Sequence, residues 1–331
     1  MRLINLVRQS QRRLVVPLMG YPGTQLTNTT LKQNEFNWGI QFWSLSELAD
    51  LLQPDAIFFM MDLSVEAGAL GFPIRYPLEE SPSVEQHLVK EVADLDQFMS
   101  TDILKDGRAT VFLKTMELMA ENLDILKGAY CIGPFTLAGL LTGASEIALA
   151  TIDRPEFLHE VLNFCTQVIT KYVVALVDSG ADIIAILEPT AVFLSPQQFE
   201  EFSGNYIKKI NRAIHAIPVL HICGDTSHLI EKMCETGAEA EVVPVWLWNK
   251  ATGAILRKDY SYVHIVNCIE AIDLERTEAE VKTSKQGRVY LGSIRRLVLR
   301  RDFLEQGIRL FRLAEVPTLV LVDQEFKKSY E

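Results

Sequence analysis

The sequence predicts an α/β protein whose fold is a closed (β/α)8 TIM barrel. Apolar runs typical of buried strands alternate with helical segments about eight times, which implies parallel βαβ units. No such run is followed by G-x-G-x-x-G or by a P-loop, so the commonest reasons for an open nucleotide-binding sheet are absent. A length of 331 residues is also usual for one barrel with insertions.

In the first part of the chain, each expected element has its own signal. Residues 13–19 are a short apolar run, and leucines in one stripe over 43–52 indicate a helix. The run 55–61 is apolar throughout, as a strand covered on both faces is, and it ends at Asp62. Prolines, serines and acidic residues between 72 and 91 indicate an excursion from the core, such as a lid or hairpin.

The alternation continues through the rest of the chain. Asp153 at an N-cap, Pro155 in the first turn and Glu156 form a capping signature for a long helix with one apolar face, which Gly180 ends. We further expect four helices: over 108–126, from a capping box at 195–198 to about 216, from 225–227 towards 235, and from about 294 to 312. The remaining strands are expected over 129–132, 182–187, 218–223, 242–245, 263–268, 289–291 and 318–322.

Composition limits the classes of function. The net charge is −11 and there is no basic run, which argues against a nucleic acid or an anionic membrane as partner. The five cysteines have no paired spacing and indicate a reducing cytoplasm. We find neither the apolar core of a signal peptide nor an apolar stretch as long as a membrane span. We therefore expect a cytoplasmic protein.

His221 and Cys223 are the strongest candidates for a metal site. They end an expected strand, where side chains two residues apart share a face, so the imidazole and the thiol can converge on one ion. Both groups are ligands that zinc favours. The alternative is a core histidine bonded to a backbone carbonyl beside a packed free cysteine, which is common in proteins.

Other polar residues also follow expected strands directly, where barrel enzymes carry their chemistry. Asp62 is either a site residue or the N-cap of the next helix, with Ser64 as the rival cap. A wholly apolar strand leads directly to Glu188, which favours a site role over a solvated charge. Cys268 also ends an expected strand, but core packing is the better explanation of it.

Five segments resemble the uroporphyrinogen decarboxylase superfamily, and most closely its methylcobalamin:coenzyme M methyltransferase branch. These segments are Met61–Ala67, Gly133–Gly139, Leu187–Ala191, Leu194–Phe199 and His221–Gly224. The resemblance covers roughly Val15 to Gly237 and fades after about residue 239. We therefore interpret residues 1–331 as a single barrel domain like that of this superfamily, with an N-terminal extension over about 1–50 and a divergent C-terminal part over about 240–331.

The resemblance implies a barrel mouth that takes either a porphyrinogen or a methylated corrinoid (cobalamin) carried by a partner protein. In the methyltransferase branch, a zinc ion held by His-x-Cys and a later cysteine binds the thiol of a small acceptor molecule. His221 and Cys223 match the first two ligands. No cysteine follows Cys268, so the third ligand stays open among Cys268, Glu188 and Asp225.

The resemblance leaves three alternatives: a zinc-dependent corrinoid methyltransferase, a tetrapyrrole decarboxylase, and a catalytically degenerate corrinoid-binding protein. In the decarboxylase, an arginine-rich N-terminal segment pairs with the eight carboxylates of the substrate. In this sequence, no arginine lies between Arg13 and Arg75. We favour the methyltransferase. We predict catalytic roles for Asp62 and Glu188, and substrate-binding roles for Met61, Glu66 and Asp225.

Overall fold

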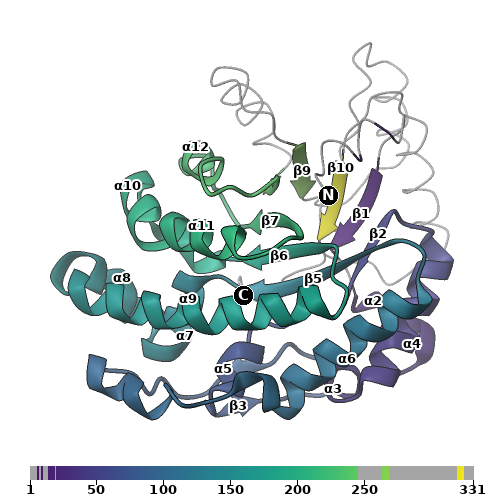
Figure 1. The fold of residues 1–331 in the computed structure, drawn as a ribbon, viewed down its shortest axis with the longest axis horizontal. Helices are drawn as coiled ribbons and strands as arrows, with labels where there is room; N and C mark the ends of the chain where they lie inside the picture. Colours follow the sequence, from purple (N-terminus) through teal and green to yellow (C-terminus); the bar gives the residue numbers. More distant parts are fainter. Residues whose placement is uncertain are drawn as a thin grey trace.

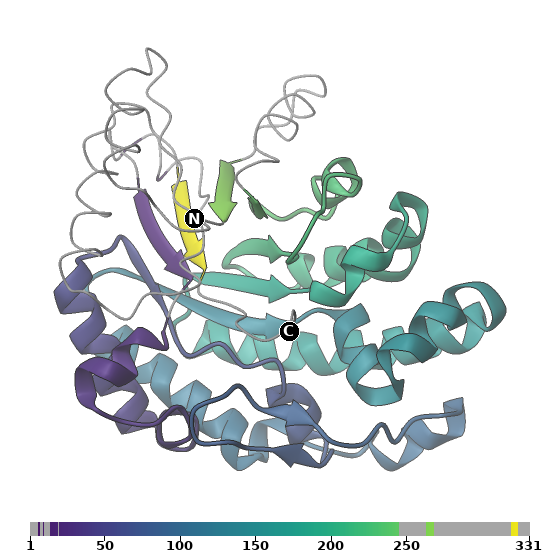
Figure 2. The ribbon, with the colours of Figure 1, turned by 180° about the vertical axis from the view of Figure 1, so that it is seen from behind.

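Eight parallel strands form a ring in the computed structural model, which describes residues 6, 9, 14–18, 20–244, 263–267 and 319–323 (Figures 1 and 2). Six of them are hydrogen-bonded neighbours in the order β2, β5, β6, β7, β8, β9. β1 pairs with β10, while β10 lies against β9 and β1 lies against β2, so the order closes on itself. The predicted (β/α)8 barrel is confirmed. The strands are β1 (Leu14–Leu18), β2 (Ala56–Phe58), β5 (Leu126–Ile132), β6 (Ile183–Leu187), β7 (Ile217–His221), β8 (Ala240–Pro244), β9 (Val263–Asn267) and β10 (Leu319–Asp323).

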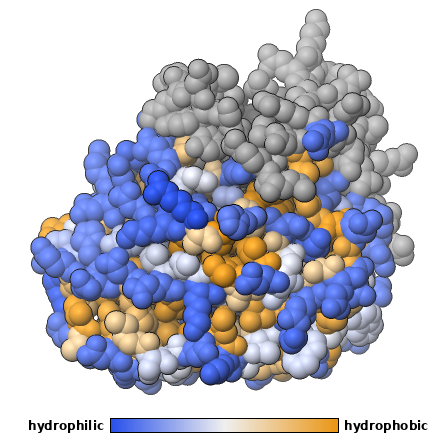
Figure 3. Space-filling model, viewed as in Figure 1, coloured by the Kyte–Doolittle hydropathy of each residue, from blue (hydrophilic) through white to orange (hydrophobic). Residues whose placement is uncertain are grey.

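The helices cover the outside of the ring. The longest, α9 (Pro155–Asp178), buries one apolar face as predicted, and Gly180 follows its end with a φ of 106°. The others are α2 (Pro22–Thr27), α3 (Leu31–Phe36), α4 (Trp38–Leu52), α5 (Val65–Ala69), α6 (Gly107–Asn122), α7 (Pro134–Thr142), α8 (Ala144–Asp153), α10 (Pro196–Phe199), α11 (Asn205–Arg212) and α12 (Ile230–Met233), with 3-10 turns η1 (Val92–Gln97), η2 (Ile103–Lys105) and η3 (Pro189–Phe193) and a π-helical turn η4 (Glu200–Gly204). On the face drawn in Figure 3, hydrophobic and hydrophilic side chains alternate in patches over this helical layer.

The described residues from Leu14 to Asp50 belong to the barrel. β1 lies in the predicted N-terminal extension, yet it is a strand of the ring. α2 packs closely on α4 at Gly23, where no side chain would fit: a Cβ there would lie 2.3 Å from the carbonyl oxygen of Ser44. The excursion expected over 72–91 contains a small antiparallel hairpin, β3 (Ile74–Arg75) and β4 (Ser83–Val84), as predicted.

Two expected helix starts are wrong. Asp153, which was expected to cap α9, is instead the last residue of α8. α9 begins at Pro155, and its N-cap residue, Arg154, makes no capping hydrogen bond through its side chain. After β7, the carboxylate of Asp225 accepts hydrogen bonds from the backbone and hydroxyl of Ser227, which forms a turn, so the next helix begins only at Ile230. The capping box at Ser195 is confirmed.

Several expected boundaries also move. The helix predicted over 43–52 begins at Trp38, the one predicted over 108–126 ends at Asn122, and the strand predicted over 55–61 spans only Ala56–Phe58. The chain of helical turns after Ser195 ends at Arg212. The elements expected over 289–291 and 294–312, as well as Cys268, lie outside the described residues.

The expectation that no apolar stretch reaches the length of a membrane span is wrong. α9 is long and apolar enough by length and composition, as α7 and α8 would be if they were one bent span. However, 56% of the most apolar window of α9 is buried inside the structure. This burial is typical of a core helix, and α9 packs on β5.

Candidate functional site

The carboxyl ends of β5, β6 and β7 are level with one another at one rim of the barrel. Ile132 is opposite Leu187, and Leu187 is opposite His221. Gly133, Glu188 and Ile222 therefore leave the sheet side by side at this rim. Because parallel strands deliver their next residues to the same edge, segments far apart in sequence can build one site there.

His221 and Cys223 converge at the end of β7. The Nε2 atom of His221 lies 2.9 Å from the Sγ atom of Cys223. The strand ends at His221, so Cys223 lies just beyond it, directly before Gly224, whose φ of 91° favours glycine in the turn that follows. His221 is buried and Cys223 is half-buried, so the thiol side of the pair is accessible. The predicted convergence is confirmed, although the strand is shorter than expected.

This pair fits zinc as two of its ligands. Tetrahedral bonds of about 2.0–2.1 Å to nitrogen and about 2.3 Å to sulfur place the two atoms about 3.6 Å apart, so a small side-chain rotation would admit the ion. In the part of the chain that the structure describes, no group of three or more His, Cys, Asp or Glu side chains could hold a metal. The imidazole and the thiol are thus a partial donor set of the right chemistry, and Cys268 lies outside the described residues.

Glu188 holds three elements together beside this pair. Its carboxylate is completely buried and accepts hydrogen bonds from the backbone amides of Phe135 (3.1 Å) and Thr136 (2.5 Å) and from the hydroxyl of Ser203 (3.1 Å). Its own backbone amide donates to the carbonyl oxygen of His221 at 2.9 Å. Burial raises the pKa of Glu188 to about 7, and these hydrogen bonds oppose the shift.

Two observations argue against Glu188 as the third metal ligand. Both of its oxygens already accept hydrogen bonds from the start of α7 and from η4. The carboxylate also lies against Gly133, where a Cβ would be 2.3 Å from its Oε2. The structure therefore favours a positioning role, in which Glu188 connects α7, η4 and the strand that carries His221.

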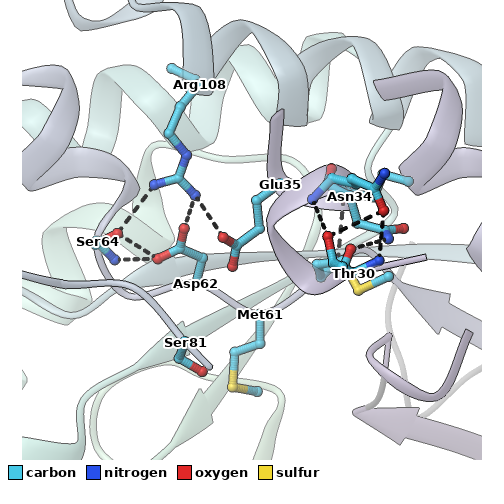
Figure 4. Close-up of polar contacts among 12 residues, drawn as sticks. Thr30, Asn34, Glu35, Met61, Asp62, Ser64, Ser81 and Arg108 are labelled. Carbon is cyan, nitrogen blue, oxygen red and sulfur yellow. Dashed lines mark hydrogen bonds and ion pairs between the residues drawn. The ribbon is translucent and has the colours of Figure 1, made fainter. Parts of the chain in front are cut away.

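Asp62 forms a buried ion pair three strands away from the His221 end of β7 (Figure 4). One of its oxygens accepts from the backbone and hydroxyl of Ser64, both at 2.7 Å, and the other pairs with the guanidinium of Arg108. Arg108 also donates to the Ser64 hydroxyl at 3.2 Å. Ser64, not Asp62, is the N-cap of α5, so the helix-cap alternative for Asp62 is wrong.

Arg108 and Glu35 complete this cluster and were missed at the level of sequence. Glu35 points at the same guanidinium from α3, with 3.9 Å between its Oε2 and the Nη2 of Arg108 (Figure 4). Burial, together with the charge of Asp62, raises the pKa of Glu35 to about 9. The ring of Tyr76, from the hairpin segment, lies 4.7 Å from the guanidinium carbon. No motif joins these residues, which meet only through the fold.

The predicted substrate-binding residues have unequal environments. Glu66 is buried, its Oε1 accepts from the backbone amide of Ile132 at 2.9 Å, and burial raises its pKa to about 8. Met61 is buried, and its carbonyl oxygen accepts a hydrogen bond from the hydroxyl of Tyr21. Asp225 is exposed in the turn after Cys223. The roles of all three, and the catalytic roles of Asp62 and Glu188, stay predictions.

The chain resembles known proteins along most of its described part. The family model described as uroporphyrinogen decarboxylase (URO-D) matches residues 46–252. The methylcobamide:CoM methyltransferase MtbA of Methanosarcina acetivorans is 31% identical over 193 residues, which cover 55% of this chain and 56% of that protein. A uroporphyrinogen decarboxylase of Thermodesulfovibrio yellowstonii is 24% identical over 195 residues, which cover 57% of this chain and 56% of that protein.

A solved structure shows the same fold. The methyltransferase from Methanosarcina mazei superposes with a TM-score of 0.75 at 22% sequence identity, over 85% of this chain and 86% of that chain. The chain spans about half the length of the curated relatives that it matches.

Proposed function

The chain belongs to the uroporphyrinogen decarboxylase family, and we propose that within it the protein is a corrinoid-dependent methyltransferase. It would move a methyl group from a methylated corrinoid on a partner protein to a small thiol or a similar acceptor. The observation that carries the proposal is the approach of the His221 imidazole and the Cys223 thiol to 2.9 Å at the rim of the barrel. The relatedness to methylcobamide:CoM methyltransferases supports it.

The proposal includes zinc bound by His221 and Cys223, with a third ligand from outside the described residues. When bound, zinc lowers the pKa of a coordinated thiol, so that the acceptor is present as the nucleophilic thiolate at neutral pH. The half-buried Cys223 leaves the acceptor a way to the pair, whereas His221 is fixed in the interior. Glu188 would act on the pair indirectly, through its backbone hydrogen bond to His221.

In the reaction, the acceptor sulfur forms a bond to the methyl carbon, and the cobalt–carbon bond breaks with its electron pair left on cobalt. The proton of the thiol is released when the acceptor binds. The chain's contribution is to hold the sulfur in line with the methyl group and to exclude water from the mouth. We also propose a cytoplasmic location, since the four cysteines that the structure describes are free thiols.

The test measures zinc and methyl transfer in the same preparations. The purified full chain should contain about one zinc ion per chain, the stoichiometry of a closed or open zinc site. It should also methylate a small thiol, such as coenzyme M, at the expense of methylcobalamin. His221→Ala and Cys223→Ser should lose both properties. His215→Ala, which removes an exposed histidine elsewhere, is the matched control and should keep them.

Two other outcomes would replace the proposal. A metal-free protein that decarboxylates uroporphyrinogen would establish the decarboxylase. The similarity to the Thermodesulfovibrio yellowstonii protein supports this alternative. A protein that binds corrinoid but neither holds zinc nor transfers methyl groups would be a catalytically degenerate member of the family.

A further inference from the structure

A polar cavity opens at the end of β1, beside α2. It has a volume of about 400 Å³ and is lined by α2 and residues 28–31 on one side and by Glu79 of the hairpin segment on the other. Tyr21, which also lines it, donates its hydroxyl proton to the carbonyl oxygen of Met61, next to Asp62. The cavity therefore belongs to the mouth of the barrel, where the chain leaves β1 and β2.

The closed order of the strands places this cavity across the mouth from the His221–Cys223 pair. β1 lies four strands from β7 in either direction around the ring. A ligand that reaches both places must therefore extend across the barrel opening. A small thiol bound at His221 and Cys223 is too short to do so, whereas a macrocycle that lies over the mouth brings its edge to the rim.

Side-chain hydrogen bonds hold the wall of the cavity. The hydroxyl of Thr29 accepts from the side-chain amide of Asn34 at 2.8 Å and contacts the hydroxyl of Thr27 at 2.9 Å. Gln41 donates to the carbonyl oxygen of Asn34 at 2.9 Å and accepts from the backbone amide of Met60 at 3.3 Å. This network ties the cavity wall to the segment between β2 and Asp62.

The chemistry of the lining selects against anions. None of the described residues that line the cavity is basic, and its one charged member is the carboxylate of Glu79. Gln25 and Asn28 present exposed carboxamides that make no hydrogen bond to the described residues, and Thr24 and Thr30 add hydroxyls. Carboxamides and hydroxyls hydrogen-bond neutral amide groups well, whereas a carboxylate beside Glu79 would be unpaired and repelled.

We propose that this cavity binds carboxamide side chains at the edge of a corrin ring that lies across the mouth. The inference rests on the proposed function and deepens it. The corrin of cobalamin carries acetamide and propionamide side chains around its edge, whereas a porphyrinogen substrate carries carboxylates there. The lining at β1 therefore distinguishes the two tetrapyrroles of the family, and it matches the first. Gln25 and Asn28 are the specificity-determining residues.

The test measures the affinity of the full chain for free corrinoids by absorbance titration. Gln25→Ala and Asn28→Gly each remove one carboxamide, and glycine keeps the left-handed conformation of residue 28, where φ is 52°. Each variant should bind hydroxocobalamin about five- to tenfold more weakly than the wild type, the effect of one lost hydrogen bond. Gln167→Ala, which removes an exposed carboxamide from α9, is the matched control and should bind with unchanged affinity.

Two further ligands identify which group occupies the cavity. Cobinamide keeps the ring amides but lacks the nucleotide tail, and its affinity should fall in the two variants as that of cobalamin does. Cobyrinic acid carries carboxylates in place of the amides, and it should bind the wild type more weakly than cobinamide. If the variants weaken cobalamin but not cobinamide, the cavity holds the nucleotide tail and the proposal is overturned.

The failure of this inference can be told apart from the failure of the proposed function. Unchanged corrinoid affinity in both variants, or no measurable binding of cobalamin and cobinamide to the wild type, would overturn the role of the cavity. Methyl transfer from methylcobalamin that still depends on His221 and Cys223 would then leave the proposed function intact. Loss of transfer in His221→Ala with weaker corrinoid binding in Asn28→Gly would support both.

Discussion

The two sides of the barrel mouth differ in how their polar side chains are paired and how far they are buried. At the end of β7, a histidine and a cysteine converge, and the cysteine is half-buried. At the end of β2, Asp62 and Arg108 form a buried ion pair, and the buried carboxyl of Glu35 lies beside it. The difference teaches that one side presents a partly accessible pair of side chains, while the other pairs its buried charges internally. The β7 side is suited to exchange ligands, whereas the β2 side is suited to fix the fold around it.

The largest effect should come from breaking the β2 cluster. Arg108→Met leaves the carboxylate of Asp62 buried without its partner, which we expect to lower the free energy of unfolding by about 3–5 kcal/mol. Urea denaturation followed by circular dichroism measures it. Arg154→Met, which breaks the exposed pair with Glu91, should cost at most about 1 kcal/mol.

The double variant Asp62→Asn/Arg108→Met sharpens this prediction. It removes both charges, so it should be more stable than Arg108→Met alone. If the single Arg108 variant is as stable as the wild type, the β2 cluster is not structural, and the contrast between the two sides fails.

A second effect should come from crowding Glu188. In Gly133→Ala, the new Cβ would lie 2.3 Å from the Oε2 of Glu188, so the carboxylate must move from the amides at the start of α7. We expect a loss of about 1–3 kcal/mol in the free energy of unfolding, by thermal or urea denaturation. Gly107→Ala is the matched control, because nothing lies within 4 Å of its new Cβ. Equal stability of the two variants would contradict a tight contact at Gly133.

The third prediction concerns pH. Burial raises the pKa values of Glu35 to about 9, of Glu66 to about 8 and of Glu188 to about 7, from an ordinary value of 4.5. The folded state therefore binds more protons than the unfolded chain above about pH 4.5, so stability should fall as the pH rises towards each folded pKa. Above pH 7, the remaining loss comes mainly from Glu35 and Glu66.

Glu35→Gln isolates one of these groups. Because glutamine stays neutral, the variant should lose about 2–3 kcal/mol less stability than the wild type between pH 6 and pH 8. Urea unfolding at several pH values measures both slopes. Glu121→Gln, which alters an exposed carboxylate on α6, should keep the slope of the wild type. A Glu35→Gln slope equal to that of the wild type would show that Glu35 is ionised in the fold.

The smallest effect on stability should come from the β7 side. Cys223→Ala removes one half-buried thiol from a turn, so the free energy of unfolding should change by less than about 1 kcal/mol. The same variant should lose zinc and methyl transfer under the proposed function. A loss of stability above about 2 kcal/mol in metal-free protein would show that this side also serves the fold.

The parts of the site that are local in sequence could be predicted, and the parts that are distant could not. Cys223 is two residues from His221, so their spacing and the glycine after them sufficed to expect convergence. Arg108 is 46 residues from Asp62, and no sequence pattern relates a residue in the first turn of α6 to the end of β2. The same holds for Ser203, which reaches Glu188 from the π-helical turn η4, 15 residues along the chain.

By itself, the sequence determined the alternation of buried strands and amphipathic helices, the barrel that this alternation builds, and the approach of His221 to Cys223. These depend on hydrophobic period and on neighbours along the chain, which a linear pattern records. Only the tertiary structure decided that the first 50 residues supply a strand of the ring, that Asp62 is neutralised by Arg108, and that Glu188 faces α7. Those contacts join groups distant in sequence, and the free energy of burying a charge selects its partner from whatever the closed barrel brings within reach.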